Sequence, residues 1–186
     1  MKNFTACFLL ADGFEETEAI MTADILKRIG VNIIFAGIEN KTIRGTHNFY
    51  ITTDKLIEDI SINDFDVIIL PGGLPGTTNL RNSPLVINLI KEAYNNKKIC
   101  AAICAAPIVL RDAGITKNKI ITGYPNCEQL SYDPNFKFTG NDVETDGLII
   151  TAKGMGKSAS FAFAIAQALG YNQNEINNIA SSAFID

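Results

Sequence analysis

Short apolar segments alternate with amphipathic segments along the whole sequence. Apolar runs of strand length occupy residues 3–11, 31–37, 66–70, 98–103 and 119–122. Helical patterns fill most of the intervening sequence, at residues 15–29, 83–95, 105–113, 157–169 and 173–183. Apolar strands that alternate with helices predict an α/β fold, in which helices cover both faces of a mostly parallel sheet.

Local signals mark where several of these segments begin, end or turn. Gly30 is expected to end the first helix. Ser83 followed by Pro84 predicts an N-cap and the first residue of a helix. Residues 143–153 predict a hairpin that turns at an Asp-Gly pair and adds antiparallel strands to the sheet. Residues 47–53 alternate in polarity, which predicts a strand with one exposed face.

Length and composition fit an ordinary globular protein. The chain has 186 residues, of which 47% are hydrophobic and 19% charged, so we expect one domain spanning residues 1–186. Because 16 Lys and Arg face 20 Asp and Glu, we expect no nucleic acid and no membrane among its partners. The apolar run at residues 4–11 is too short for a signal peptide or a membrane helix. A cytoplasmic location with reduced thiols is expected.

The numbers of cysteines and histidines limit the metal sites and redox motifs that the chain could form. The four cysteines form no C-x-x-C pair, which disfavours a zinc ribbon or a thioredoxin-type motif. Cys7 and Cys100 fall inside predicted strands and are interpreted as buried structural residues, whereas Cys127 in a polar loop is unassigned. The single histidine, His47, excludes a zinc site with two or more His ligands. We therefore expect no metal and no organic cofactor.

The predicted sheet also predicts where a ligand would bind. In open α/β sheets, ligands bind outside the carboxyl ends of the strands, where the winding order switches. Three segments come directly after predicted strands, namely residues 12–18, 71–76 and 104–107. Candidate functional residues are expected in these segments.

Cys104 is the strongest candidate for a reactive side chain. It ends an apolar strand, and Pro107 fits the first turn of the following helix. Ala102 and Ala106 flank it at two residues on either side, as small residues flank the nucleophile at the sharp strand-to-helix turn of α/β hydrolases. Because the amino end of a helix favours a thiolate, we expect a lowered pKa for this thiol. The alternative is a buried structural cysteine.

Two backbone amides are candidates for stabilising an oxyanion. The strand that ends in Leu-Pro-Gly-Gly is expected beside the strand of Cys104, and its paired glycines leave N–H groups open. The amides of Gly73 and Ala105 are the expected donors, and Gly72 is a candidate pocket residue. The alternative is an ordinary turn, and the PGGLPG segment lacks the glycine order of a dinucleotide site.

Three acidic residues open the first helix. Glu15 and Glu16 are interpreted as carboxylates that complement the helix dipole on a solvated face, and Glu15 is also a candidate pocket residue. Glu18 lies one turn into the helix, at the edge of its apolar stripe. We expect its carboxyl to enter the crevice, to reach the thiol and to hold a proton there with a raised pKa.

Taken together, three motifs resemble those of the ThiJ/PfpI family, which shares its domain type with class I glutamine amidotransferases. They are GFEETEA at residues 13–19, DVIILPGG at 66–73 and AAICAAP at 101–107. Their order and spacing are most similar to the branch of the parkinsonism-associated protein deglycases and their bacterial relatives. The similarity runs through essentially the whole chain, including the hairpin at 143–154.

The resemblance implies both a fold and a site. The fold would be a flavodoxin-like three-layer sandwich with an added antiparallel hairpin, usually assembled as a homodimer. The reactive residue would be Cys104, hydrogen-bonded to a protonated Glu18, with the Gly73 and Ala105 amides nearby.

The chain departs from its hydrolytic relatives at the position of the triad histidine. Ala105 follows Cys104 where protease-like members and glutamine amidotransferases carry a histidine after or near the nucleophile. Tyr124, a candidate pocket residue, stands where several deglycase relatives have a histidine. Peptidase and amidotransferase activities are therefore disfavoured. His47 falls near a loop that borders the pocket in relatives, often across the dimer. It is interpreted as a solvated strand residue with a candidate role in the pocket.

Two functions use the same thiol. As an enzyme, the protein would be a cofactor-independent glyoxalase or deglycase, in which Cys104 attacks methylglyoxal, glyoxal or their early adducts on proteins and Glu18 moves the proton. Alternatively, oxidation of Cys104 would make it a non-enzymatic redox sensor or holdase chaperone that responds to oxidative stress. A third interpretation is a relative that has lost activity.

The loop at residues 154–158 reads Gly-Met-Gly-Lys-Ser. It lacks the glycine spacing of a nucleotide-binding P-loop, because residue 151 is Thr. We interpret it as the cap of the next helix, at the border of the crevice.

Overall fold

A seven-stranded sheet runs through the described part of the chain. The structure is a computed structural model, and it describes residues 2–125 and 134–185. The strands follow the order β10-β11-β7-β6-β1-β2-β5, and all neighbours are parallel except the β10–β11 hairpin. Their bounds are β1 Thr5–Leu10, β2 Asn32–Gly37, β5 Lys55–Leu56, β6 Val67–Leu70, β7 Ile99–Ile103, β10 Val143–Asp146 and β11 Ile149–Ala152.

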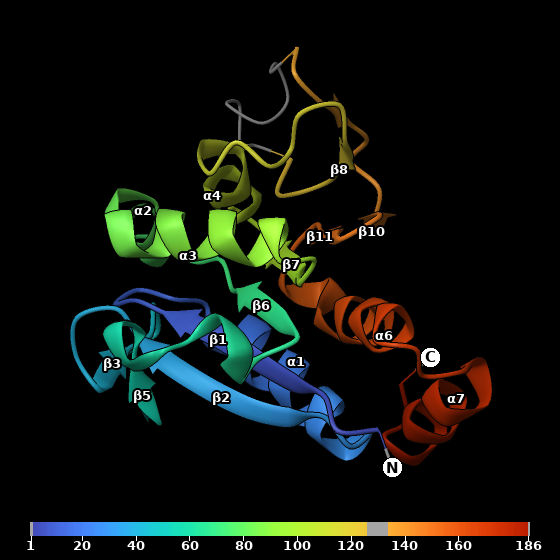
Figure 1. Cartoon of the computed structure of the whole chain (residues 1–186). Helices are drawn as coiled ribbons and strands as arrows, with labels where there is room; N and C mark the ends of the chain where they lie inside the picture. Colours follow the sequence, from blue (N-terminus) through green and yellow to red (C-terminus); the bar gives the residue numbers. More distant parts are fainter. Residues whose placement is uncertain (1, 126–133, 186) are drawn as a thin grey trace.

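Helices cover both faces of this sheet (Figure 1). The helices α1 and α6 pack against each other on one face, whereas α2, α3 and α4 cover the other. Two apolar clusters separate these layers, because alternate side chains of each strand point to opposite faces. The mostly parallel α/β sandwich and its antiparallel hairpin are thereby confirmed. The helices are α1 Glu16–Arg28, α2 Gly76–Asn82, α3 Pro84–Asn95, α4 Pro107–Asp112, α6 Ser158–Ala168 and α7 Gln173–Ser182.

Several element boundaries follow from single residues. The Ser83 hydroxyl accepts a hydrogen bond from the Val86 amide at 3.5 Å, and Pro84 begins α3 as predicted. Gly30, at φ 103°, takes the chain out of α1 in a conformation that favours glycine. Gly147, at φ 64°, forms the turn between β10 and β11.

The segment at residues 47–53 differs from its prediction. The strand there is only β4 (Tyr50–Thr52), and it pairs with β3 (Thr42–Arg44) in a separate two-stranded sheet. His47 lies in the loop between them rather than in a strand. The partner β3 was not predicted, because it is three residues long with one buried side chain and carries no readable alternation.

Other short elements were not predicted either. Helix α2 has seven residues and reads GTTNLRN, without an apolar stripe. Strands β8 (Ile120–Ile121) and β9 (Lys137–Phe138) form a further two-stranded sheet. The sequence predicted β8 but not its partner.

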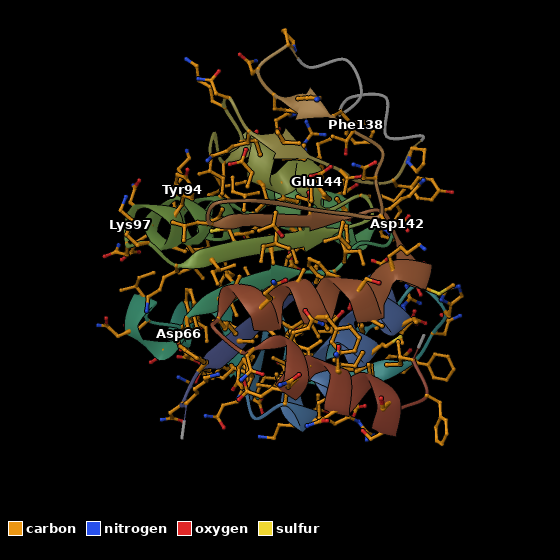
Figure 2. The ribbon with its side chains drawn as sticks, turned by 90° about the vertical axis from the view of Figure 1, so that its right-hand side faces the viewer. Asp66, Tyr94, Lys97, Phe138, Asp142 and Glu144 are labelled. Carbon is orange, nitrogen blue, oxygen red and sulfur yellow. The ribbon has the colours of Figure 1, made fainter. Side chains whose placement is uncertain are left out.

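The candidate segments meet at one end of the sheet. After β2 and β5 the chain crosses back past β1 to form β6 and then β7, so the winding order switches between β1 and β6. In Figure 2, Asp66 and Lys97, which precede β6 and β7, lie at one end of the sheet, and Asp142 lies at the opposite end. The carboxyl ends of the parallel strands face this second end, where Glu18 and Cys104 follow β1 and β7.

Among the described residues, no helix has both the length and the apolar character needed to cross a membrane.

Candidate active site

Cys104 occupies a sharp turn between β7 and α4. Its backbone adopts φ 63°, a conformation that side chains other than glycine rarely adopt. Ala102 and Ala106 on either side are fully buried, so larger side chains would not fit there. The Cys104 carbonyl accepts a hydrogen bond from the Tyr124 amide at 2.8 Å, which ties the next loop to the turn. The strained turn leaves the thiol partly exposed at the carboxyl end of the sheet.

The carboxyl of Glu18 lies against this thiol. Its side chain is 1% exposed, and its Oε2 accepts a hydrogen bond from the Gly72 amide at 2.7 Å. A hydrogen-bonding interaction between the Glu18 carboxyl and the Cys104 thiol affects the pKa of both groups. The other oxygen, Oε1, is buried without a partner of ordinary hydrogen-bond geometry. If the carboxyl were protonated on Oε1, this oxygen could donate a hydrogen bond instead of remaining a buried acceptor without a partner.

The pKa of Glu18 is raised, as the sequence predicted. Burial is the largest cause and raises the pKa to about 7, although the hydrogen bonds from Gly72 and Cys104 oppose it. A substantial fraction of Glu18 is therefore protonated near neutral pH.

The expectation of a lowered thiol pKa is wrong in direction. Burial, followed by the nearby Glu18 carboxylate, raises the pKa of Cys104 to about 12. The helix gives little help, because α4 begins only at Pro107 and has six residues. The carboxyl and the thiol interact, and the carboxyl, with a pKa of about 7, loses its proton well before the thiol does. The chemistry is that of a Cys-Glu pair rather than of a free thiolate.

The two predicted amides point at the sulfur. The backbone N–H groups of Ala105 and Gly73 both hydrogen-bond to the Cys104 thiol and favour its ionised form. Gly73 has φ 90°, and a Cβ there would lie 2.4 Å from the Glu15 nitrogen. Only glycine therefore presents its amide to the sulfur at this position.

Gly72 completes the contact between the thiol and the carboxyl. A Cβ at Gly72 would lie 2.7 Å from both the Cys104 Cβ and the Glu18 Oε2. The Gly72 carbonyl also accepts the amide of Glu15 at 2.9 Å. Glu15 thus borders the site through its backbone, and its charge raises the pKa of Glu18 further.

A cleft of about 390 Å³ adjoins the thiol. Tyr124, Lys153, Gly154 and Lys157 are among the residues that line it. A Cβ placed on Gly154 would stand 3.9 Å from the Cys104 sulfur and 3.8 Å from the Tyr124 ring. The sequence placed Tyr124 and the 154–158 loop near the crevice but missed Lys153, because a lysine at a strand end carries no pattern of its own.

His47 and Glu16 form a separate cluster. Glu16 is 8% exposed, so the prediction of a solvated carboxylate is wrong for this residue. Its carboxylate contacts the His47 Nδ1 at 3.0 Å and accepts the His47 and Phe49 amides at 2.7 and 3.4 Å. The hydrogen bond to the imidazole raises the pKa of His47, whereas hydrogen bonds outweigh burial and lower the pKa of Glu16.

The same cluster contains the atoms best placed to bind a cation among the described residues. Ligand atoms of Glu15, Glu16 and His47 all lie within 4.8 Å of one another. The carboxylate of Glu16 and the imidazole of His47 already satisfy each other, and the His47 side chain is 65% exposed. The His47 Nδ1 atom lies 3.8 Å from a Glu15 carboxylate oxygen and 3.0 Å from a Glu16 carboxylate oxygen. His47 thus belongs to this cluster rather than to the Cys104–Glu18 pair.

The remaining cysteines differ from Cys104. Cys7 and Cys100 are fully buried in strands, and burial raises the pKa of each to about 12, as expected of structural residues. Cys127 lies outside the described residues.

These features define a class of protein: a flavodoxin-like α/β sandwich with a cysteine at a strand-to-helix turn and a buried carboxyl beside it. The family model described as the DJ-1/PfpI family matches residues 4–168. The chain belongs to this family.

Individual relatives support the same family assignment. Protein dj-1beta of Drosophila melanogaster is 31% identical over 182 residues, covering 97% of both chains. The glutathione-independent glyoxalase DJR-1.2 of Caenorhabditis elegans is 31% identical over 155 residues, 83% of this chain and 82% of the relative. These relatives support a DJ-1-like function.

Solved structures of this family have the same fold. The crystal structure of Drosophila DJ-1beta has a TM-score of 0.93, with 31% identity and 99% of each chain covered. Oxidized Toxoplasma gondii DJ-1 has a TM-score of 0.88 at 27% identity, covering 97% of this chain and 98% of that chain.

Proposed function

We propose that the protein is a cofactor-independent glyoxalase or deglycase that converts 2-oxo aldehydes, or their early adducts on proteins, into 2-hydroxy acids. The observation that carries this proposal is the Cys104 thiol, held between two amide donors and a buried carboxyl whose pKa is about 7. The naming of one relative as a glutathione-independent glyoxalase supports the same chemistry.

The reaction begins with addition of the Cys104 sulfur to the aldehyde carbon. A sulfur–carbon bond forms, and the electron pair of the C=O double bond moves to oxygen, where the amides of Gly73 and Ala105 stabilise it. The thiol proton passes through Glu18 to this oxygen, which yields a hemithioacetal. Glu18, with a pKa near neutrality, is suited both to give and to accept this proton.

The rearrangement then needs proton transfer between adjacent carbons. Glu18 takes the proton from the carbon that carries sulfur and returns it to the neighbouring carbon. The hydroxyl proton of the first carbon moves to the carbonyl oxygen of the second, which leaves a thioester of the 2-hydroxy acid. Water hydrolyses the thioester, the sulfur–carbon bond breaks, and the proton returns to Cys104. One water is consumed overall, so methylglyoxal gives lactate without an external oxidant or reductant.

A substitution experiment tests this proposal. We expect Cys104→Ser to abolish conversion of methylglyoxal to lactate, and Glu18→Gln to reduce kcat/KM by about 10²-fold or more, the scale of a lost general acid–base. The matched control is Cys100→Ser, which removes a buried thiol four residues away. Lactate formation by Cys104→Ser at the wild-type rate would refute the proposal.

A redox role for the same thiol is the second candidate. Cys104 is partly exposed whereas Cys7 and Cys100 are buried, so oxidants would reach Cys104 first. A protonated Glu18 would donate a hydrogen bond to a sulfinate on Cys104. The similarity to an oxidized Toxoplasma DJ-1 structure favours this candidate as well.

We also propose that the chain forms a homodimer. Large apolar side chains are exposed on α1, on β4 and in the loop before β4: Ile20 is 45% exposed, Phe49 68% and Tyr50 66%. Such side chains favour burial against a partner. Light scattering during gel filtration should give twice the chain mass of 20.2 kDa, and Phe49→Lys should shift it toward the monomer. A wild-type monomer at working concentration would exclude this assembly.

A further inference from the structure

The cleft beside Cys104 has a positively charged lining that addition to a simple carbonyl does not require. Lys153 and Lys157 both line it, together with the Tyr124 ring. Methylglyoxal and glyoxal are neutral and small, so the Cys-Glu pair and the two amides account for their chemistry. The lysines must be explained separately.

The cleft comes close to the thiol at Gly154, one of its lining residues. Gly154 stands between them, because a Cβ on this residue would contact both the Cys104 sulfur, at 3.9 Å, and the Tyr124 ring, at 3.8 Å. Glycine keeps this space open although its backbone, at φ 165°, is extended and accepts any residue. A group bonded to the carbon that Cys104 attacks would therefore extend into the cleft.

The two lysines give the described lining of the cleft a positive charge, which the Asp142 carboxylate and, when ionised, the Glu18 carboxylate beside the thiol oppose. Lys157 forms an ion pair with Asp142 at 2.8 Å, and both side chains are substantially exposed. Among the described residues, no carboxylate comes within 4.0 Å of the Lys153 ammonium. Two ammonium groups thus face the Asp142 carboxylate. Figure 2 shows Asp142 at the end of the sheet where the catalytic segments lie.

The backbone adds to this positive charge. A 3-10 turn at Met155–Lys157 leads directly into α6, so the amino end of an eleven-residue helix borders the cleft. The dipole of that helix favours a negative charge at this position. The lysines and the helix end therefore act in the same direction.

We propose that this cleft binds an anionic substituent, a carboxylate or a phosphate, of the carbonyl compound that reacts with Cys104. The proposal rests on the proposed function and specifies its substrate class: 2-oxo aldehydes that carry a negative charge near the carbonyl are preferred over neutral methylglyoxal. Lys153 supplies a cation that forms no ion pair with any described carboxylate, and Lys157 exchanges its pairing with Asp142 for the substrate.

A matched pair of alkylating probes tests the cleft without relying on turnover. Iodoacetate and iodoacetamide are similar in size and react with the same thiol, but only iodoacetate is negatively charged. The rate ratio of iodoacetate to iodoacetamide at Cys104, measured by intact mass, reports attraction of an anion. Changes in thiol pKa affect both probes and cancel in the ratio.

We expect the double substitution Lys153→Gln, Lys157→Gln to lower this ratio about fivefold or more, since one or two close charge-assisted contacts are lost. Asp142→Asn should change the ratio in the opposite direction, because it removes the opposing negative charge. Lys91→Gln, on the exposed surface of α3, is the matched control for net charge and should leave the ratio unchanged. An unchanged ratio in the double lysine variant would overturn the proposal.

Protection experiments identify the anion. Inorganic phosphate and acetate are each tested for slowing the reaction of Cys104 with iodoacetamide in wild type and in the double lysine variant. Lysine-dependent protection by phosphate alone would identify a phosphorylated substrate, and protection by acetate alone a carboxylate. If the ratio depends on the lysines but methylglyoxal is not converted, the anion site stands and the glyoxalase activity falls; the reverse result removes the anion site alone.

Discussion

The environment of Cys104, the proposed reactive residue, is set by its neighbours more than by its own side chain. Small residues at 102 and 106 indicated the turn, and the structure places Cys104 there at φ 63°. The flanking pattern is local, so it could be read from the sequence. The pKa could not, because it depends on burial and on a carboxyl 86 positions away in the sequence, that of Glu18.

The first prediction concerns the stability cost of the buried carboxyl. The pKa of Glu18 is about 7 in the folded protein against 4.5 for an ordinary glutamate. The folded state therefore binds more protons than the unfolded state between these values, and stability falls as pH rises from about 4.5 to 7. Glu18→Gln should remove this fall and raise the free energy of unfolding at pH 8 by about 3 kcal/mol.

Urea denaturation at pH 8 and pH 5 measures this effect. The variant should exceed wild type most clearly at pH 8, where the wild-type carboxyl is ionised and buried, and the difference should shrink at pH 5. Equal stabilities at pH 8 would show that the carboxyl carries no such penalty. The substitution should cost activity at the same time, as is common where a site is built from a strained or buried group.

The second prediction concerns Gly72. Gly72→Ala places a methyl group 2.7 Å from both the Cys104 Cβ and the Glu18 Oε2, which forces the thiol and the carboxyl apart. We expect activity to fall at least about tenfold, together with a loss of about 1–3 kcal/mol in stability from overpacking. Gly156→Ala, where an added Cβ meets nothing within 4 Å, is the matched control in denaturation. Wild-type activity in Gly72→Ala would contradict the close packing of the pair.

At the level of elements, the long strands and helices were predictable and the short ones were not. Strand β6 is four buried apolar residues, and α3 begins at a Ser-Pro pair, so each carries its own signal. The β3–β4 pair and helix α2 depend on contacts made by other parts of the chain. The burial of Glu16 could not be predicted from its local sequence for the same reason, because it depends on the loop that folds over this residue.

The third prediction concerns this loop. Glu16 holds it to α1 by accepting the backbone amides of His47 and Phe49. Glu16→Ala leaves these donors without their acceptor, and we expect a loss of about 1–3 kcal/mol in the free energy of unfolding. His47→Gln keeps the backbone contacts and removes only an exposed ion pair, so it should reduce stability less than Glu16→Ala does. Equal effects of the two substitutions would show that the imidazole, rather than the backbone, carries the contact.

At the level of the whole molecule, strand order brings together residues that are far apart in the sequence. Glu18, Gly73 and Cys104 follow β1, β6 and β7, which are adjacent in the sheet. Strand–helix alternation predicted the parallel sheet, and the rule for strand ends predicted where its ligand would bind. Neither predicted the lysine-lined cleft, because a loop after β11 forms it through packing against Tyr124.

The fourth prediction follows from the burial of the thiols in the fold. Cys7 and Cys100 are fully buried between sheet and helices, whereas Cys104 is partly exposed. Mild peroxide should therefore add about 32 Da, two oxygens, at Cys104 before either of them. Peptide mapping after oxidation measures this selectivity, with Cys104→Ser as the control. Oxidation of Cys7 or Cys100 at a comparable rate would count against the redox role.

The central claim is that Cys104 and Glu18 act as one acid–base pair. The most direct test is the pH dependence of Cys104 alkylation by iodoacetamide in wild type and in Glu18→Gln. In wild type, reactivity should rise only well above pH 9.0, the ordinary value for the thiol, because burial and the Glu18 carboxylate raise the pKa of Cys104 to about 12. In Glu18→Gln the carboxylate no longer opposes ionisation of the thiol, so the midpoint should move down from the wild-type value. The same midpoint in both proteins would contradict the account.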